Sequence, residues 1–196
     1  MKSSYLRSLM LLGILSTFLL TACGMAQANK PKSTPTPLPP TATPILNSVY
    51  TSPDGLFQIK FPGNWAALTS KTQSPNIVDA IAFGDNANKT AFLATSVTSG
   101  IPTSLLPMAL QGGLTAISGV TQVNVSNSTS TFPSGLNSWT RADATFDDGG
   151  TPSIGLLFGL NHNGHAFFCI LIYPTESKDV LNTTLLPMLA SLKFLK

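Results

Sequence analysis

Residues 154–173 have the sequence IGLLFGLNHNGHAFFCILIY, and this stretch decides the fold. Two apolar runs, Ile154 to Leu160 and Ala166 to Tyr173, are separated by residues 161–165, with Asn163-Gly164 at their centre. Asn-Gly between two strand-like runs is a strong signal for a tight β-hairpin. The second run is apolar without alternation, which predicts a central strand covered on both faces. A sheet that is covered twice needs a helical layer on each side.

Alternating apolar residues predict further strands before this hairpin. An opening hairpin should join residues 48–50 to residues 56–61, because the intervening Ser52-Pro53-Asp54-Gly55 is a favourable turn. Its proline presets φ and its glycine takes the left-handed position. The remaining strands are expected at 77–83 and 91–97, around the polar turn 85–89, and at 122–125 and 138–146.

Two segments predict the helical layers. The first carries an apolar stripe at helical spacing, formed by Leu106, Leu110, Leu114 and Ile117. The second runs from Ser177 to Leu192, and Pro187 must kink or restart that helix because proline lacks a backbone donor. The expected fold class is therefore α+β, an antiparallel β-sheet with helices on both faces.

Three segments resemble the PsbP-like superfamily. They are YTSPDGLFQIKFPGNW at 50–65, GLNHNGHAFFCILIYP at 159–174 and LASLKF at 189–194. The family includes an extrinsic protein of photosystem II, a nuclear Ran-binding protein and many bacterial envelope lipoproteins. The resemblance implies an antiparallel sheet sandwiched between helices. It implies little about activity, because members of the family have unrelated roles and a fold does not fix a function.

The N-terminus has the pattern of an export signal. Lys2 and Arg7 precede the apolar run Leu9 to Leu20, which is too short to span a bilayer, since a span needs about 20 helical residues. Leu20-Thr21-Ala22-Cys23 resembles the lipobox of bacterial lipoproteins. The resemblance implies that the peptide is cut before Cys23 and that this cysteine carries the lipid, with palmitate among its acyl chains. The alternative is an ordinary secreted protein in which Cys23 is incidental.

A proline- and threonine-rich segment, KPKSTPTPLPPTATP, follows at 30–44. Such a sequence cannot bury enough apolar surface to fold, and its prolines favour an extended polyproline II spacer. The predicted organisation is a signal peptide at 1–22, a lipidated cysteine and stalk at 23–46, and one globular domain at 47–196. The expected location is the outer face of a bacterial cytoplasmic membrane.

The charge balance argues against a nucleic-acid partner. The chain has 11 basic and 8 acidic residues, a formal net charge of +3. The basic residues Lys2, Arg7, Lys30 and Lys32 all lie before residue 47, which leaves 7 basic against 8 acidic residues in the domain. The domain is nearly neutral, whereas a nucleic-acid-binding domain needs a basic surface.

The two histidines are candidates for a metal site. His162 and His165 bracket the Asn163-Gly164 turn, and two imidazoles three residues apart across a tight turn could reach one ion. Asp147 or Asp148, from the turn at 147–150, could supply a third ligand. The alternative is that both histidines are solvated residues at the tip of a hairpin.

No motif predicts catalysis. Cys169 lies inside an apolar strand, and a catalytic thiolate needs a basic partner and exposure, so a buried structural thiol is expected. The sequence contains no G-x-S-x-G motif and no phosphate-binding glycine-rich loop. We therefore expect a protein that is not an enzyme and needs no cofactor.

One strand could contact a partner. Arg141 and Asp143 share a strand face with Trp139, and tryptophan and arginine are frequent anchors in interfaces. The alternative is a polar strand face with a surface ion pair worth less than about 1 kcal/mol. Trp65, which follows a strand, is expected in the core or at the end of a hairpin.

Two hypotheses for function follow. The first is a non-enzymatic, membrane-anchored binding or accessory module for an envelope protein. The second is a lipoprotein that binds a small ligand or a metal through the His162/His165 hairpin tip or a pocket between sheet and helix.

Overall fold

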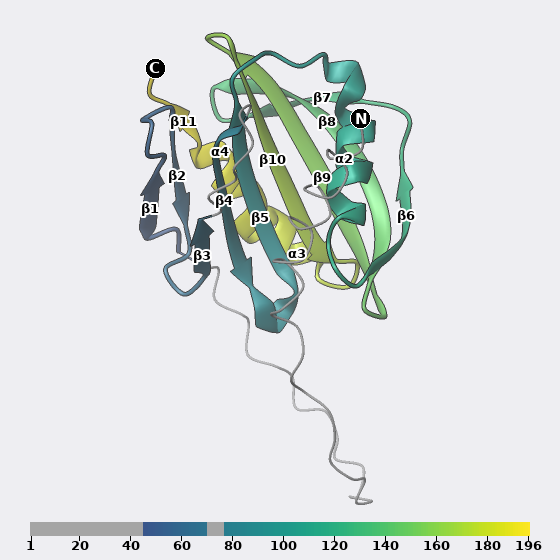
Figure 1. Cartoon of the computed structure of the whole chain (residues 1–196). Coiled ribbons are helices and arrows are strands. Elements are labelled where there is room, and N and C mark those ends of the chain that lie inside the picture. The colour runs from purple at the N-terminus through teal and green to yellow at the C-terminus, as the bar shows by residue number, and fades with distance from the viewer. Residues whose placement is uncertain (1–44, 70–76) are drawn as a thin grey trace, which may run out of the picture. The chain divides into compact units, whose positions relative to one another are not determined.

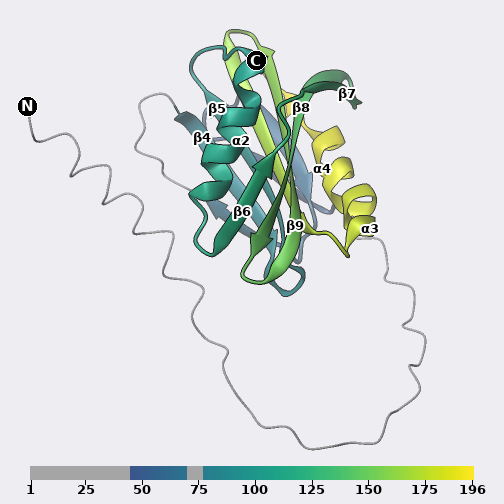
Figure 2. The same ribbon diagram turned by 90° about the vertical axis from the view of Figure 1, so that its right-hand side faces the viewer.

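A computed structural model describes residues 45–69 and 77–196. The predicted signal peptide, the lipidation site Cys23 and the proline-rich stalk lie outside the described residues. The described chain contains a large antiparallel sheet with α2 on one face and α3 and α4 on the other (Figures 1 and 2). The expected α+β class, with helices on both faces of the sheet, is confirmed.

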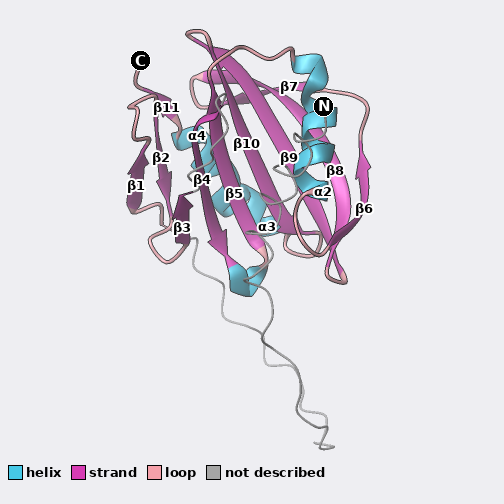
Figure 3. Ribbon diagram, in the orientation of Figure 1, coloured by secondary structure: helices cyan, strands magenta, loops and turns pink. Residues whose placement is uncertain are grey.

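The strands are mostly those predicted from sequence (Figure 3). Their bounds are β1 Ser48–Thr51, β2 Phe57–Phe61, β3 Ala66–Thr69, β4 Ile77–Asp85, β5 Thr90–Val97, β6 Val120–Val125, β7 Ser130–Ser134, β8 Asn137–Asp148, β9 Thr151–His162, β10 His165–Pro174 and β11 Lys193–Phe194. The helices are α2 Leu106–Thr115, α3 Lys178–Val180 and α4 Leu186–Ser191. The short strands β3, β7 and β11 were not predicted.

The central hairpin is formed by β9 and β10, as predicted. Their ladder runs from His162 opposite His165 to Ser153 opposite Pro174. Asn163 and Gly164 have positive φ values of 47° and 81°. A two-residue hairpin turn of type I′ needs positive φ at both central residues. The order of the large sheet is β3-β4-β5-β10-β9-β8-β6, with β7 paired to β8, so β10 is the middle strand.

The predicted opening hairpin also forms, in a sheet of its own. Strands β1 and β2 pair antiparallel, and β11 adds to the other edge of β2. The Ser52 hydroxyl accepts hydrogen bonds from the backbone N–H groups of Leu56 and Phe57, and Gly55 has φ 64°. The Tyr50 hydroxyl donates to Asp79 at 2.7 Å, which joins the small sheet to β4.

Helix α2 covers one face of the large sheet. Its predicted stripe, Leu106, Leu110 and Leu114, is buried, and Ile117 packs beside it just beyond the helix end. The stripe contacts side chains of β8, β9 and β10 that point to this face, namely Ala142, Ala144, Phe146, Leu157 and Ile172. A Cβ atom on Gly159 would lie 2.6 Å from Leu106 Cδ2. This glycine therefore lets the first turn of α2 approach β9 closely.

The segment before β11 covers the other face. It consists of helix α3, a π-helical segment at Leu181–Leu185, and α4. Pro187 lies in the first turn of α4, where the missing backbone donor of proline costs nothing. Of the predicted kink or restart at Pro187, the structure shows a change from π-helical to α-helical geometry at Leu186, with helical backbone angles on both sides. Side chains of this segment bury against the small sheet and the inner strands, chiefly Leu185, Met188, Leu189 and Leu192. Buried residues of β10 thus contact helices on both faces.

Candidate binding site

The predicted histidine pair lies at one end of the β9–β10 hairpin. The His162 ring stacks on Phe194 of β11, with ring centroids 4.4 Å apart and planes 18° apart. The Nδ1 atom of His165 is buried and has no hydrogen-bond partner. Both histidines are therefore partly packed side chains, and the expectation of two solvated residues at the hairpin tip is not met.

The predicted third metal ligand is wrong. Asp147 pairs with Pro152 and Asp148 with Thr151, at the beginning of β9, whereas His162 is the last residue of the same strand. Ten residues of β-strand separate Pro152 from His162, a distance of about 33 Å. Among residues 45–69 and 77–196, no group of three or more His, Cys, Asp or Glu side chains is placed to hold a metal ion.

Cys169 is a free, buried cysteine of β10, as expected. Burial raises the pKa of its thiol well above the ordinary value. A thiol that stays protonated is a poor nucleophile. Cys169 therefore functions as a core residue.

The prediction that Trp139 anchors a partner needs correction. Trp139 is fully buried on the face of the sheet that α4 covers, with its ring centroid 6.3 Å from that of Phe194. The sequence correctly placed it on the same face as Arg141 and Asp143. However, it could not show that β11 and α4 cover that face at the level of Trp139. Trp65 is buried in the same core, as expected.

Arg141 and Asp143 form the predicted ion pair. The guanidinium donates Nε to Oδ1 at 2.6 Å and an Nη to Oδ2 at 2.7 Å, a bidentate arrangement. The Arg141 side chain is 28% exposed and that of Asp143 is 48% exposed. The guanidinium carbon also lies 5.9 Å from the centroid of the Phe132 ring. The pair is therefore held in place while it remains open to solvent.

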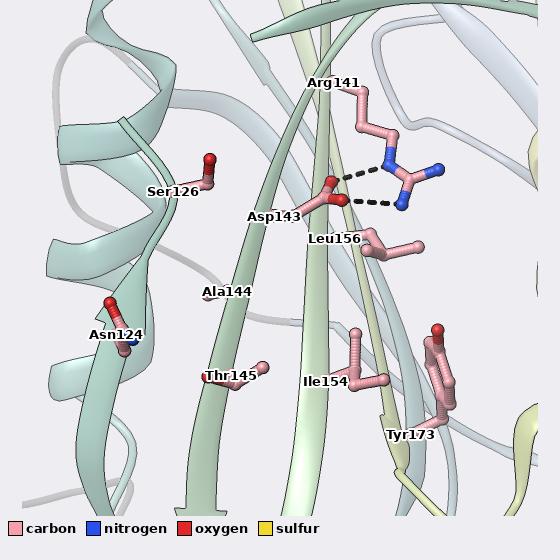
Figure 4. Close-up of a pocket in the computed structure, with 9 residues that line it drawn as sticks. All are labelled: Asn124, Ser126, Arg141, Asp143, Ala144, Thr145, Ile154, Leu156 and Tyr173. Atoms are coloured by element: carbon pink, nitrogen blue, oxygen red, sulfur yellow. Dashed lines mark hydrogen bonds and ion pairs between the residues drawn. The ribbon is translucent and has the colours of Figure 1, made fainter. Parts of the chain in front are cut away.

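This ion pair lies at the rim of an open hollow of about 370 Å³ on the same face of the sheet (Figure 4). The residues that line the hollow are neighbours through the pairing of the strands. Asn124, Thr145, Ile154 and Tyr173 form one row across β6, β8, β9 and β10. The next row contains Asp143 opposite Leu156, with Ser126 beside Asp143 through a backbone hydrogen bond. Most polar residues of the lining lie on β8 or on β6 and just after it, whereas the two lining residues of β9, Ile154 and Leu156, are apolar.

The hollow exists because the helices do not cover the whole sheet. Helix α3 packs against β10, and α4 packs against β2 and β7. The part of the face formed by β6 and the second half of β8 therefore remains open, and Asn124, Ser126 and Thr145 are exposed there. Figure 2 shows α3 and α4 on the opposite side of the sheet from α2.

Tyr173 closes the hollow on the β10 side. Its hydroxyl points into the hollow, toward Leu156 and the ion pair (Figure 4). Burial raises the pKa of Tyr173, Arg141 opposes the shift and Asp143 adds to it. Tyr173 is therefore a neutral phenol at physiological pH, able both to donate and to accept a hydrogen bond.

Sequence reasoning found Arg141 of this site but missed Asn124, Thr145 and Tyr173. The approach of Tyr173 depends on the pairing of β9 with β8 and β10, and that of Asn124 on the pairing of β6 with β8, where the register shifts between Thr121 and Asn124. Gln122, inside the shift, has φ 53°. A bulge changes which side chains share a face, so the alternation in residues 120–125 could not identify the row.

A second feature is an end of the domain with exposed apolar side chains, which we call the distal end. It holds the β9–β10 turn, the β7–β8 turn, the first turn of α2 and the C-terminus (Figure 1). Four of the six exposed large apolar side chains of the described residues lie there: Leu105, Met108, Leu136 and Leu195. Leu136 is fully exposed.

The described chain begins at the other end. Asn47 accepts a hydrogen bond from the Gly63 N–H, just after β2 ends. The following strand β3 starts with Ala66 opposite Gly84, next to the turn at residues 85–89, which lies at the end of β4 and β5 away from the β9–β10 turn. Ile45 and the distal end are therefore at opposite ends of the domain.

Comparison with known proteins supports the fold. No family model and no curated protein matches the chain. The structure is similar to cyanobacterial PsbP (CyanoP) from Synechocystis, with a TM-score of 0.57, 14% identity and coverage of 81% of this chain and 99% of that one. A structure from Bacteroides thetaiotaomicron matches with a TM-score of 0.53 and 15% identity over 78% of this chain, which spans only 50% of the Bacteroides chain. The domain thus has a PsbP-like fold, as the resemblance of residues 50–65 and 159–174 implied.

A third similar structure is LpqN of Mycobacterium tuberculosis, described as involved in cell envelope biogenesis. Its TM-score is 0.45, with 14% identity and coverage of 76% of this chain and 93% of that one. This likeness is too low to carry an argument. No helix within the described ranges is long and apolar enough to cross a bilayer.

Proposed function

We propose that this protein is a membrane-anchored, extracytoplasmic lipoprotein whose domain is a non-enzymatic binding or accessory module. The observation that carries the proposal is Leu20-Thr21-Ala22-Cys23 directly after a short apolar run. A basic start, a short apolar core and a cysteine at the cleavage point form a specific combination. Among the described residues, the only cysteine is buried, which supports a non-enzymatic role.

Transfer energies explain why such an anchor would hold. Each buried methylene contributes about 0.8 kcal/mol, so one acyl chain binds a bilayer marginally whereas two or more bind stably. The residues from Gly24 to Leu46 form the proposed spacer. If they extend at about 3.1 Å per residue, the domain could work up to about 70 Å from the bilayer.

Replacement of Cys23 should abolish anchoring. We expect the wild-type protein to incorporate a palmitate analogue in cells and to sediment with membranes, and Cys23→Ala to lose the label and the membrane fraction. Cys169→Ala is the matched control, because Cys169 is buried and should not be acylated. An unlabelled, soluble wild-type protein would exclude the lipid anchor.

The distal end supports an envelope protein as the partner. A chain tethered through Ile45 leaves the opposite end of the domain free to meet another protein. Single exposed apolar side chains are common on protein surfaces. Several such side chains at one end of a domain favour an interaction surface there. Leu136, Met108 and Leu195 would supply the apolar contacts there.

The second candidate function is a lipoprotein that binds a small ligand. The observation in its favour is the hollow beside Arg141, which has a volume typical of ligand sites and several converging polar groups. The hollow replaces the His162/His165 hairpin tip as the place where such a ligand would bind.

A further inference from the structure

We propose that the hollow binds a neutral, hydroxyl-rich ligand of the oligosaccharide class. This inference rests on the second candidate function and names the class of its ligand, and it requires neither the lipid anchor nor a protein partner. It rests on the polar groups of the hollow, their net charge and the backbone geometry around them.

The polar groups both donate and accept hydrogen bonds. Asn124 offers an amide, and Ser126, Thr145 and Tyr173 offer hydroxyl groups. Among residues 45–69 and 77–196, the side chains of Asn124, Thr145 and Tyr173 make no hydrogen bond, and the Ser126 hydroxyl bonds to Ser128 outside the hollow. A sugar hydroxyl also donates and accepts at the same oxygen, so it can pair with each of these groups in either direction.

The charges in the hollow cancel. Arg141 and Asp143 are the only charged residues of the described chain that line it, and they neutralise each other at 2.6 Å. An anionic ligand would meet the Asp143 carboxylate, and a cationic one would meet the Arg141 guanidinium. The remaining guanidinium N–H groups and carboxylate lone pairs can still bond to a neutral ligand, and hydrogen bonds to charged groups are stronger than neutral ones.

The floor gives such a ligand an apolar contact. Ile154 lies between Thr145 and Tyr173 in the cross-strand row and is partly exposed. The C–H face of a sugar ring can pack against this side chain while its hydroxyl groups reach the polar rim. The volume of about 370 Å³ falls in the lower part of the range for small-molecule sites.

The backbone geometry disfavours an extended peptide. A peptide that joins a sheet bonds to the free edge of a strand. The hollow lies on the face of β6, β8, β9 and β10. The backbone groups of β8, β9 and β10 already pair with neighbouring strands, and the free edge of β6, the edge strand, lies in the plane of the sheet rather than on this face. A ligand in the hollow therefore meets side chains alone, and this arrangement suits hydroxyl groups better than a peptide backbone.

The test measures binding to the full chain, purified in an amine-oxide detergent that has no sugar headgroup. Saturation-transfer NMR would be recorded with maltotriose, cellotriose and triacetylchitotriose as neutral probes. Trigalacturonate, deacetylated chitotriose and a capped trialanine peptide serve as the anionic, cationic and peptide probes. We expect saturation transfer to at least one neutral trisaccharide and none to the other probes.

Two variants locate the site. Asn124→Ala and Thr145→Ala change exposed side chains, so both should fold, and each should raise the dissociation constant of the bound trisaccharide by about fivefold or more through loss of a hydrogen bond. Asn64→Ala, which changes an exposed asparagine in the turn after β2, should leave it unchanged. The proposal is overturned if no neutral trisaccharide binds, if only a charged or peptide probe binds, or if the two variants bind as the wild type does. None of these results would affect the lipid anchor, which palmitate labelling tests separately.

Discussion

Trp139→Ala should destabilise the domain by about 3–5 kcal/mol, the largest effect we expect from a single substitution. Trp139 has no exposed surface and packs in the core between the large sheet and α4. Truncation removes the apolar contact and leaves a cavity that the surrounding strands cannot close. Urea denaturation followed by circular dichroism measures the change.

Two further variants separate the causes of that effect. The Trp139 Nε1–H group is buried and has no hydrogen-bond partner, so Trp139→Phe removes an unsatisfied donor while it keeps most of the volume. We expect it to cost less than about 1.5 kcal/mol. Leu136→Ala, three residues away but fully exposed, should change the stability by less than about 0.5 kcal/mol. If Trp139→Ala were as mild as Leu136→Ala, the burial of Trp139 would be wrong.

Gly135→Ala should destabilise the domain by about 2–5 kcal/mol, because two costs add. Gly135 has φ 60°, and an L-residue in this left-handed region costs about 1–2 kcal/mol. In addition, a Cβ atom there would lie 2.8 Å from the backbone oxygen of Ala190 at the end of α4. Because a backbone oxygen cannot rotate away, overpacking costs a further 1–3 kcal/mol, roughly.

Gly149→Ala is the matched control for this position. Gly149 has φ 57°, nearly that of Gly135, but nothing lies within 4 Å of a Cβ atom built on it. Its substitution should therefore cost only the backbone part, about 1–2 kcal/mol. Equal losses of stability in the two variants would show that the β7–β8 turn does not pack against α4.

The sequence predicted the layers of the fold because their signals are local. The Asn163-Gly164 turn fixes the central hairpin, and the unbroken apolar run of β10 is explained by helices on both of its faces. Pro187, which lacks a backbone donor, lies where the last helix changes from π-helical to α-helical geometry. The short strands β3, β7 and β11 were not predicted, because a strand of two to five residues has too few side chains to show an alternation of apolar and polar residues.

The site was harder to predict because it depends on pairing between distant strands. Arg141 and Asp143 are two residues apart, so their ion pair could be read from one strand. Asn124 and Tyr173 reach the same hollow only through the register of β6, β8, β9 and β10. Likewise, Trp139 looked like a surface anchor because the residues that cover it, β11 and the end of α4, lie more than 45 residues later in the chain.

The central claim is that a tethered domain presents its distal end to an envelope protein. The most direct test places a photo-crosslinking amino acid at Leu136 in the anchored protein, in living cells, with Val49 on β1 as the comparison position. Both side chains are exposed, but Leu136 lies in the β7–β8 turn of the distal end, whereas Val49 lies on β1. A second substitution, Leu195→Asp, adds a charge to the same end without changing the crosslinking position.

We predict that Leu136 gives a reproducible adduct with one envelope protein, that Val49 does not, and that Leu195→Asp weakens the adduct. No adduct from Leu136, or the same adducts from Leu136 and Val49, would contradict the account.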